Sequence, residues 1–203
     1  MLGLSLNELW QDEPDAIARR AGLCTSLLER LSEDGALIVI EPALHDTTRQ
    51  LMAVRDVLQG QGAPIFAPCP AGTSQCPLLL RERDWCHEEL PLALPAPLAE
   101  LAKKAGLRYE GLSYAYVTLR RGPPLSERLD GAARVVGGPI ATKGRRELQL
   151  CVGGQMRRLN VLDRDGDRLA TARRGTVISA EIRADSDTLR LGRDAEAAIR
   201  RDA

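Results

Sequence analysis

The chain has 203 residues, of which 44% are hydrophobic and 28% are charged, and its 28 Lys and Arg residues balance 28 Asp and Glu residues to give a formal net charge of zero. This length and composition are typical of a soluble globular protein with one good core or two small domains. No apolar run approaches the roughly 20 residues that a membrane-spanning helix needs, so no membrane partner is expected. Residues 1–10 lack the basic start of a secretory signal, and a reducing, cytoplasm-like compartment is therefore expected.

The first predicted element is an amphipathic helix over residues 14–31. Pro14 suits the first turn of a helix, and apolar residues then recur at steps of four and three along one face. These residues are Ile17, Ala21, Cys24, Leu28 and Leu31. Because free cysteine is among the most buried residue types, we expect Cys24 to be a buried apolar side chain and not a ligand.

An α/β sheet is predicted from the next elements. Residues 36–42 form a continuous apolar run, which is typical of a central strand buried on both faces of a parallel sheet. Asp46 is expected to cap a helix that ends near Gly60, and residues 64–67 predict another strand. Glu41 ends the first of these strands at the edge where α/β folds bind ligands, so it is either a site residue or a structural one.

Residues 69–97 are predicted to be an irregular, proline-rich loop, too long for an ordinary connection. Loops of this length usually carry function or need a staple. A short helix over residues 98–105 and a strand over residues 113–119 complete a first domain, residues 1–122. Gly122-Pro123-Pro124 marks its boundary.

Residues 131–192 predict a small antiparallel β module, with strands at 147–152, 155–162 and 176–182 and a hairpin turn at Gly153-Gly154. The remaining residues, 193–203, are expected to be a tail or a short helix. Basic residues are concentrated in this part of the chain, because residues 131–175 carry ten Lys and Arg against four Asp and Glu. The excess of six positive charges makes one end of the molecule locally basic.

The cysteines are the strongest functional signal. Their number, five, is odd, and Cys69, Cys76 and Cys86 fall within eighteen residues of each other, with spacings of six and nine residues between them. That pattern is a poor disulfide framework and a better set of metal ligands. The fourth ligand could be His87 or the distant Cys151, which faces away from Leu148 and Leu150 on its predicted strand. The spacing alone leaves structural zinc possible.

Motifs spread over most of the chain resemble the methyltransferase-like family of mitochondrial small-ribosomal-subunit assembly proteins and its bacterial relatives. The motifs are Leu6-Asn7-Glu8-Leu9, Gly35 to Pro42, Ala67-Pro68-Cys69-Pro70, Cys76-Pro77-Leu78, Asp84-Trp85-Cys86-His87, Tyr109-Glu110, Ser113-Tyr114 and Leu119-Arg120-Arg121. The resemblance implies a class I methyltransferase-like sheet with a β extension. It also implies a four-iron, four-sulfur (4Fe-4S) cluster held by Cys69, Cys76, Cys86 and Cys151.

The same resemblance implies that the chain corresponds to the C-terminal part of a longer protein, because residues 1–9 match a segment after the fourth strand of that fold. The Gly-rich turn and the acidic residue that would bind S-adenosylmethionine are absent, so this cofactor is expected only in a longer chain. We expect an rRNA-binding factor of the small ribosomal subunit in a bacterial-type cytoplasm, or in mitochondria if the source is eukaryotic, although no transit peptide is visible. An S-adenosylmethionine-dependent RNA or ribosomal methyltransferase is the alternative.

Seven basic residues are candidates for phosphate contacts, since neutralising several phosphates gains affinity through counterion release. They are Arg120, Arg121, Lys143, Arg145, Arg146, Arg157 and Arg158. Such clusters can equally be solvated surface. Aromatic residues make up only 3% of the chain, so recognition of the RNA backbone and shape is expected instead of base stacking.

Overall fold

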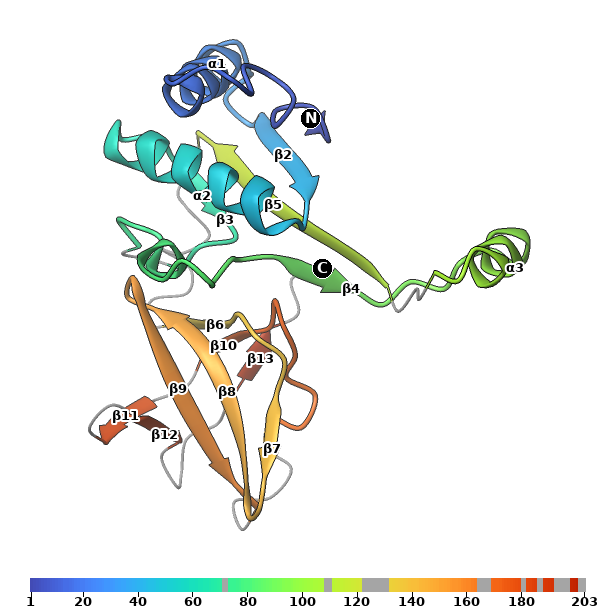
Figure 1. The fold of residues 1–203 in the computed structure, drawn as a ribbon. Helices are drawn as coiled ribbons and strands as arrows, with labels where there is room; N and C mark the ends of the chain where they lie inside the picture. The colour runs from blue at the N-terminus through green and yellow to red at the C-terminus, as the bar shows by residue number, and fades with distance from the viewer. Residues whose placement is uncertain are drawn as a thin grey trace.

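The computed structural model describes residues 1–70, 73–107, 111–121, 132–163, 169–179, 182–185, 188–191 and 198–200. In these residues the protein is a mixed α/β structure with two sheets. Figure 1 shows the first sheet and its helices in the upper half of the view and the second sheet in the lower half. The predicted boundary at Gly122-Pro123-Pro124 lies outside the described residues.

The first sheet contains β1 (Leu2–Gly3), β2 (Ala36–Pro42), β5 (Leu112–Arg120) and β3 (Ile65–Ala67) in that spatial order, and β4 (Glu88–Leu90) also pairs with β5. The pairing of β1 with β2 is parallel, whereas β5 is antiparallel to β2 and β3. It follows that β1, β2 and β3 run in the same direction. The predicted α/β sheet is confirmed, and β2 is an internal strand as expected.

Two helices cover one face of this sheet. They are α1 (Ala16–Glu29) and α2 (His45–Gly60), both close to their predicted ranges, and they share a core with Leu37 and Val39 of β2. On the other face Ile38 is 37% exposed, so the prediction that β2 is buried on both faces is wrong. The predicted cap is also wrong: Leu44 is the N-cap of α2, and Asp46 lies in the first turn.

The segment between β3 and β5 is more ordered than predicted. It contains a short 3-10 helix, η1 (Pro77–Leu80), then β4 and α3 (Ala96–Lys104). Figure 1 shows α3 standing away from both sheets, while β4 lies between the main strands of the first sheet and the second sheet. The expected irregular loop is therefore interrupted by one strand that is part of the first sheet.

The second sheet is predominantly antiparallel, as predicted for the β module; only the pairing of β12 with β9 is parallel among its described strands. Its strands are β6 (Ala133–Val135), β7 (Ile140–Thr142), β8 (Arg145–Val152), β9 (Gln155–Leu162), β10 (Val177–Ser179), β11 (Ile182–Asp185), β12 (Thr188–Leu191) and β13 (Ala198–Arg200). The strand predicted at 176–182 corresponds to parts of two strands, β10 and β11. A strand, β13, stands where a tail or short helix was expected.

The hairpin of β8 and β9 connects the two halves of the molecule. Gly153 and Gly154 both have positive φ, as their turn requires. Leu148 and Leu150 pack in the core of the second sheet, whereas Cys151 packs in the core of the first. The predicted opposite facing of Cys151 is thus confirmed, because successive strand residues project to opposite faces.

Candidate metal centre at the junction of the two sheets

Four cysteines meet where the two sheets meet. Cys69 follows β3, Cys76 is the N-cap of η1, Cys86 precedes β4, and Cys151 lies on β8. All four are free thiols. Cys76, Cys86 and Cys151 are 4%, 8% and 7% exposed, and Cys69 is half-buried. Four separate parts of the chain therefore bring a cysteine to the junction of the two sheets.

The pKa values of these thiols reflect both their burial and their closeness to one another. Burial raises the pKa of Cys76 to about 12, and the charges of Cys86 and Cys69 contribute. Burial likewise raises the pKa of Cys151 to about 12, with contributions from Cys69 and Cys86. The pKa of Cys69 is also raised, chiefly by burial. Such thiols are neutral at pH 7 unless a metal ion displaces their protons.

Arg55 is a buried cation on the α2 side of the cysteines. The residue is 1% exposed, and its guanidinium donates to Asp56 Oδ1 at 2.8 Å and to the backbone carbonyls of Thr73 and Ser74. It also lowers the pKa of Cys69, although burial of that thiol has the larger, opposite effect. Arg55 thus fixes the loop between Cys69 and Cys76 while placing a positive charge beside them.

A second buried cation, Arg134, comes from the second sheet. It lies directly opposite Cys151 in the pairing of β6 with β8, and residues paired this way project from the same face. Its Nη1 donates to Cys86 Sγ at 3.3 Å, and its Nη2 forms an ion pair with Glu88 at the start of β4. Sequence reasoning missed Arg134, which was only one of ten basic residues in its segment.

These residues fit an anionic metal centre. Each buried guanidinium beside the thiols is paired with one carboxylate, Arg55 with Asp56 and Arg134 with Glu88. Thiolates bound to a metal would add negative charge next to these cations. Four thiolates are the usual donors of an iron–sulfur cluster and one of the usual sets for structural zinc. In the described part of the chain, no group of three or more His, Cys, Asp or Glu side chains is arranged to hold a single metal ion.

The alternative ligand, His87, faces other groups. Its ring stacks on Trp85 with centroids 5.6 Å apart, and its Nε2 lies 3.2 Å from Glu89 Oε1. Burial lowers its pKa, as does the charge of Arg174. Cys24 stands apart from the four cysteines: burial alone raises its pKa to about 11, and it is 1% exposed between the helices and the first sheet. The expectation that Cys24 is a buried core residue is confirmed.

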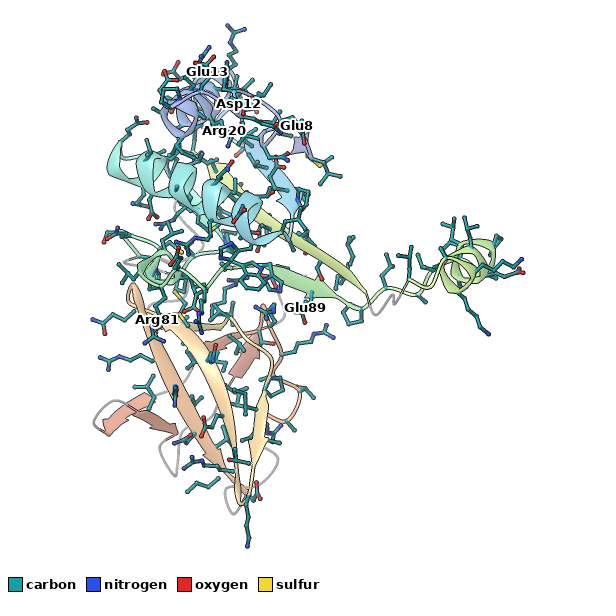
Figure 2. All side chains as sticks on the ribbon, viewed as in Figure 1. Glu8, Asp12, Glu13, Arg20, Arg81 and Glu89 are labelled. Atoms are coloured by element: carbon teal, nitrogen blue, oxygen red, sulfur yellow. The ribbon has the colours of Figure 1, made fainter. Side chains whose placement is uncertain are left out.

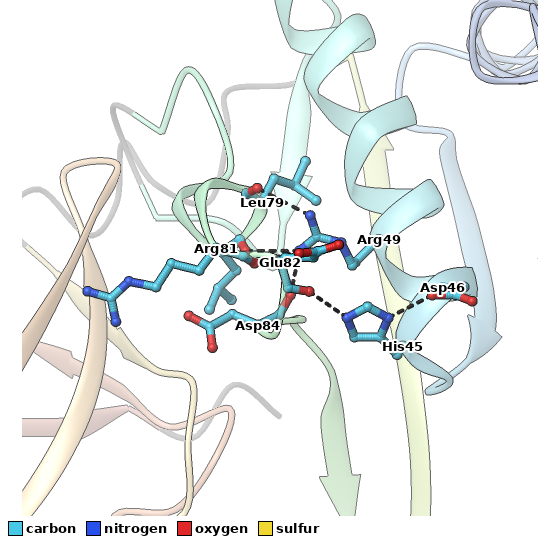
Figure 3. A network of polar contacts seen from close by, with 8 residues as sticks. His45, Asp46, Arg49, Leu79, Arg81, Glu82 and Asp84 are labelled. Atoms are coloured by element: carbon cyan, nitrogen blue, oxygen red, sulfur yellow. Dashed lines mark hydrogen bonds and ion pairs between the residues drawn. The ribbon is translucent and has the colours of Figure 1, made fainter.

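The start of α2 holds the loop between Cys76 and Cys86. Arg49 Nη1 donates to the carbonyls of Arg81 at 2.9 Å and Asp84 at 2.7 Å, and Nη2 donates to that of Leu79 at 3.2 Å (Figure 3). Beside it, His45 Nε2 lies 2.8 Å from the carbonyl of Glu82. Figure 3 shows the Arg81 side chain pointing away from Arg49, so its backbone alone is held.

His45 makes a second contact, with Asp46, whose Oδ1 lies 2.7 Å from His45 Nδ1. This bond, followed by the one to the Glu82 carbonyl, raises the pKa of His45. The ring of Trp85 packs edge-on against His45 at a centroid distance of 5.3 Å. The imidazole therefore connects the beginning of α2 to the residues just before Cys86.

The predicted phosphate-binding residues do not gather on one surface. Arg120 ends β5 and Arg121 follows it, near α1 and at the far end from the second sheet (Figure 1). Arg121 donates to the carbonyl of Glu29 at 2.7 Å, and the Arg120 guanidinium lies over the ring of Phe66. Neither arginine belongs to the second sheet.

The basic residues of the second sheet lie on two faces. Arg145 and Arg158 share the face that carries Cys151, and both are exposed. Arg146 and Arg157 project to the opposite face and are half-buried, because neighbours along a strand alternate. Lys143 is exposed in the turn before β8. Outside the module, the exposed Arg81 projects outward beside the junction of the sheets (Figure 2).

Glu41 has a structural role. It is 1% exposed, and its Oε1 accepts the backbone N–H groups of Leu6 at 2.8 Å and Asn7 at 3.3 Å. The adjoining cavity, which Arg20 also lines, measures about 10 Å³, which is room for about one water molecule. Figure 2 shows Arg20 beside the N-terminal segment of the chain, and its guanidinium donates to the carbonyls of Asn7 and Leu9 in that segment.

Among the described helices, none is long and apolar enough to cross a membrane. No curated protein matches the sequence closely enough to report. Residues 6–177 match the family described as Mitochondrial small ribosomal subunit Rsm22. This match covers β2 to β9, and it includes the four cysteines at the junction together with Arg55 and Arg134. The chain therefore belongs to the Rsm22 family of the mitochondrial small ribosomal subunit.

Proposed function

We propose that the protein carries a 4Fe-4S cluster on Cys69, Cys76, Cys86 and Cys151 and acts in assembly or translation by the small ribosomal subunit through contacts with rRNA. The convergence of four mostly buried cysteines from both sheets carries the proposal. Membership of a family named for the mitochondrial small ribosomal subunit supports the ribosomal setting, in mitochondria or in a bacterial-type cytoplasm.

A structural role is proposed for the cluster. When bound, it would supply covalent links between thiolates of the first sheet's loops and Cys151 of the second sheet. Among the described residues after position 131, Val136 and Met156 are the other apolar side chains that pack with the first core. Metal binding energy then becomes folding energy for the junction.

The first sheet is proposed to be the C-terminal part of a class I methyltransferase-like sheet. The support is its strand arrangement: β1, β2 and β3 run in one direction, and α1 and α2 cover one face. In such sheets ligands bind beyond the carboxyl ends of the parallel strands. In the described residues, the edge where β2 ends holds Glu41 bonded to backbone groups, beside a water-sized cavity.

The rRNA contact is proposed for the exposed part of the face that Arg145 and Arg158 share with the buried Cys151, with Lys143 beside it. Flat, basic strands suit contacts to phosphates and to RNA shape. Arg145 also pairs with Glu147 at 2.8 Å, which holds its guanidinium at the surface.

Metal identity tests the first half of the proposal. Protein purified without oxygen should contain about four irons and four sulfides per chain, and Cys151→Ser should lower that content. Cys24→Ser is the matched control, since its thiol lies in the core of the helices and the first sheet, and its metal content should equal that of the wild type. One zinc per chain without sulfide would show that the site binds structural zinc and not a cluster.

Binding to small-subunit rRNA fragments at several salt concentrations tests the second half. Arg158→Gln should weaken binding and lower the slope of log K against log salt by about one, and Arg145→Gln should do the same. Arg19→Gln on α1 is the control and should bind as the wild type does. Titration with S-adenosylmethionine completes the test, because tight binding to this chain would favour a methyltransferase.

A further inference from the structure

We propose that Arg134 is a positioning residue of the metal centre, whose N–H bond to Cys86 Sγ holds the thiolates in their metal-binding state and raises the reduction potential of the centre. The inference rests on the proposed metal site and assigns a role to a residue outside the ligand set. The contact that carries it is the 3.3 Å bond from Arg134 Nη1 to Cys86 Sγ.

Arg134 is placed to act on ligands from both sheets. It donates to Cys86, which is supplied by the first sheet's loop, and it stands directly opposite Cys151, which is supplied by β8. The residue is 4% exposed, so its charge is not screened by water. One guanidinium thereby neutralises negative charge at the point where the two ligand sets meet.

Glu88 fixes the direction of this guanidinium. Its carboxylate takes Nη2 in an ion pair and leaves Nη1 aimed at the sulfur. A planar guanidinium can serve both acceptors at once, whereas an ammonium group has no such fixed fork. Glu88 belongs to β4, the strand of the first sheet that lies next to the second sheet in Figure 1, so the pair forms where the two sheets meet.

The expected effect on potential follows from charge. Reduction adds one electron to the centre, and an N–H donor to a ligand sulfur favours the more negative, reduced form. Removing Arg134 should therefore lower the potential. Removing the negative charge of Glu88 while keeping Arg134 should raise it. If Arg134 and Glu88 only held the two sheets together, the potentials of their variants would shift in the same direction or not at all.

Arg174 provides a matched control. Like Arg134, it connects β4 to the second sheet, through Glu89 Oε1 at 3.0 Å and the carbonyl of Val136. Both of these partners are oxygen atoms and not sulfur. Arg174→Met thus loosens the same junction without removing a donor to sulfur.

The experiment uses the full chain, purified without oxygen, in the variants Arg134→Met, Arg134→Lys, Glu88→Gln and Arg174→Met. The potential is measured by titration with dithionite, which supplies the electron, and metal release is measured by transfer to a chelator. Arg134→Met should lower the potential and speed release roughly 10- to 100-fold, as loss of other outer-shell partners of metal ligands does. Arg134→Lys should recover part of both effects, and Glu88→Gln should raise the potential.

Wild-type behaviour of Arg134→Met, or equal behaviour of Arg134→Met and Arg174→Met, would overturn the inference. If Arg134→Met does not fold, Glu88→Gln decides, because an unchanged or lowered potential contradicts the proposed charge effect. If the wild type contains zinc and no sulfide, the proposed cluster and the proposed effect on the reduction potential both fail, because zinc is not reduced. Zinc release from Arg134→Met and Arg174→Met then tests the positioning role of Arg134 by itself.

Discussion

Asp56 accepts the backbone N–H of Cys76 with both carboxylate oxygens, each at 3.0 Å. The same carboxylate pairs with the buried Arg55 at 2.8 Å. One side chain on α2 therefore holds the backbone of a cysteine and neutralises the cation beside the sulfurs. This arrangement makes α2 the support on which the cysteine-bearing loop is built.

Asp56→Ala should destabilise the metal-loaded protein by roughly 3 kcal/mol, because it leaves Arg55 as a buried cation without its carboxylate and frees the N–H of Cys76. Urea denaturation without oxygen measures the loss. Asp34→Ala, at an exposed position, is the control and should change the free energy of unfolding by less than about 0.5 kcal/mol. Equal stability of the two variants would contradict the role of Asp56.

Arg49→Ala should open the loop between Cys76 and Cys86. Its guanidinium bonds to several carbonyls there, and bonds to charged groups contribute about 1.5–3 kcal/mol each. Trypsin cleavage after Arg81 and Arg83 should rise on the order of tenfold or more, since cleavage follows the population of the open loop. Arg19→Ala is the control. Arg19 pairs with the exposed Glu13 on the surface, so its loss should leave the cleavage rate unchanged.

The same loop should loosen as pH rises. The pKa of His45 is raised by its contacts with Asp46 and the Glu82 carbonyl, which are both acceptors, so only the protonated imidazole donates to both. This contribution is complete below the unfolded pKa of about 6.5 and is lost as pH rises through the higher folded pKa. The ratio of trypsin cleavage rates, wild type to His45→Ala, should therefore increase above pH 6.5. A constant ratio would rule out this role of His45.

Glu41→Gln should change the pH dependence of stability. Burial raises the pKa of Glu41, so the folded state favours the protonated carboxyl. Its stabilising contribution is present below the unfolded pKa of about 4.3 and is lost as pH rises through the folded value. The free energy of unfolding of Glu41→Gln, relative to the wild type, should increase from pH 4 upward. Urea denaturation at a series of pH values measures this difference, and a pH-independent difference would show that the carboxyl is not perturbed.

Local patterns in the sequence predicted α1, α2 and the longest strands, β2, β5, β8 and β9, because apolar periodicity reflects which face of an element is buried. The same reasoning predicted the direction of Cys151 relative to Leu148 and Leu150. Because side chains alternate between the two faces along a strand, Arg145 and Arg146 lie on opposite faces, as do Arg157 and Arg158. The prediction of one basic surface did not take this alternation into account.

Other features depend on partners that are distant in the sequence. The apolar run of β2 cannot reveal whether a second layer covers it, and Ile38 is exposed. The cap of α2 was misassigned because Asp46 bonds to His45, which in turn contacts the loop at Glu82. A capping residue is predicted from its neighbours, whereas this contact joins residues 37 positions apart.

The sequence by itself predicted which residues could bind a metal, with His87 or Cys151 as the fourth, and it determined on which side of its strand Cys151 lies. Only the tertiary structure decided that Arg55 and Arg134 would be the buried cations beside them. An arginine is ordinarily a surface residue, and nothing local distinguishes Arg134 from the other basic residues of its segment. Its burial depends on Glu88 and Cys86 arriving from the other sheet, because a buried charge is stable only where its partners meet it.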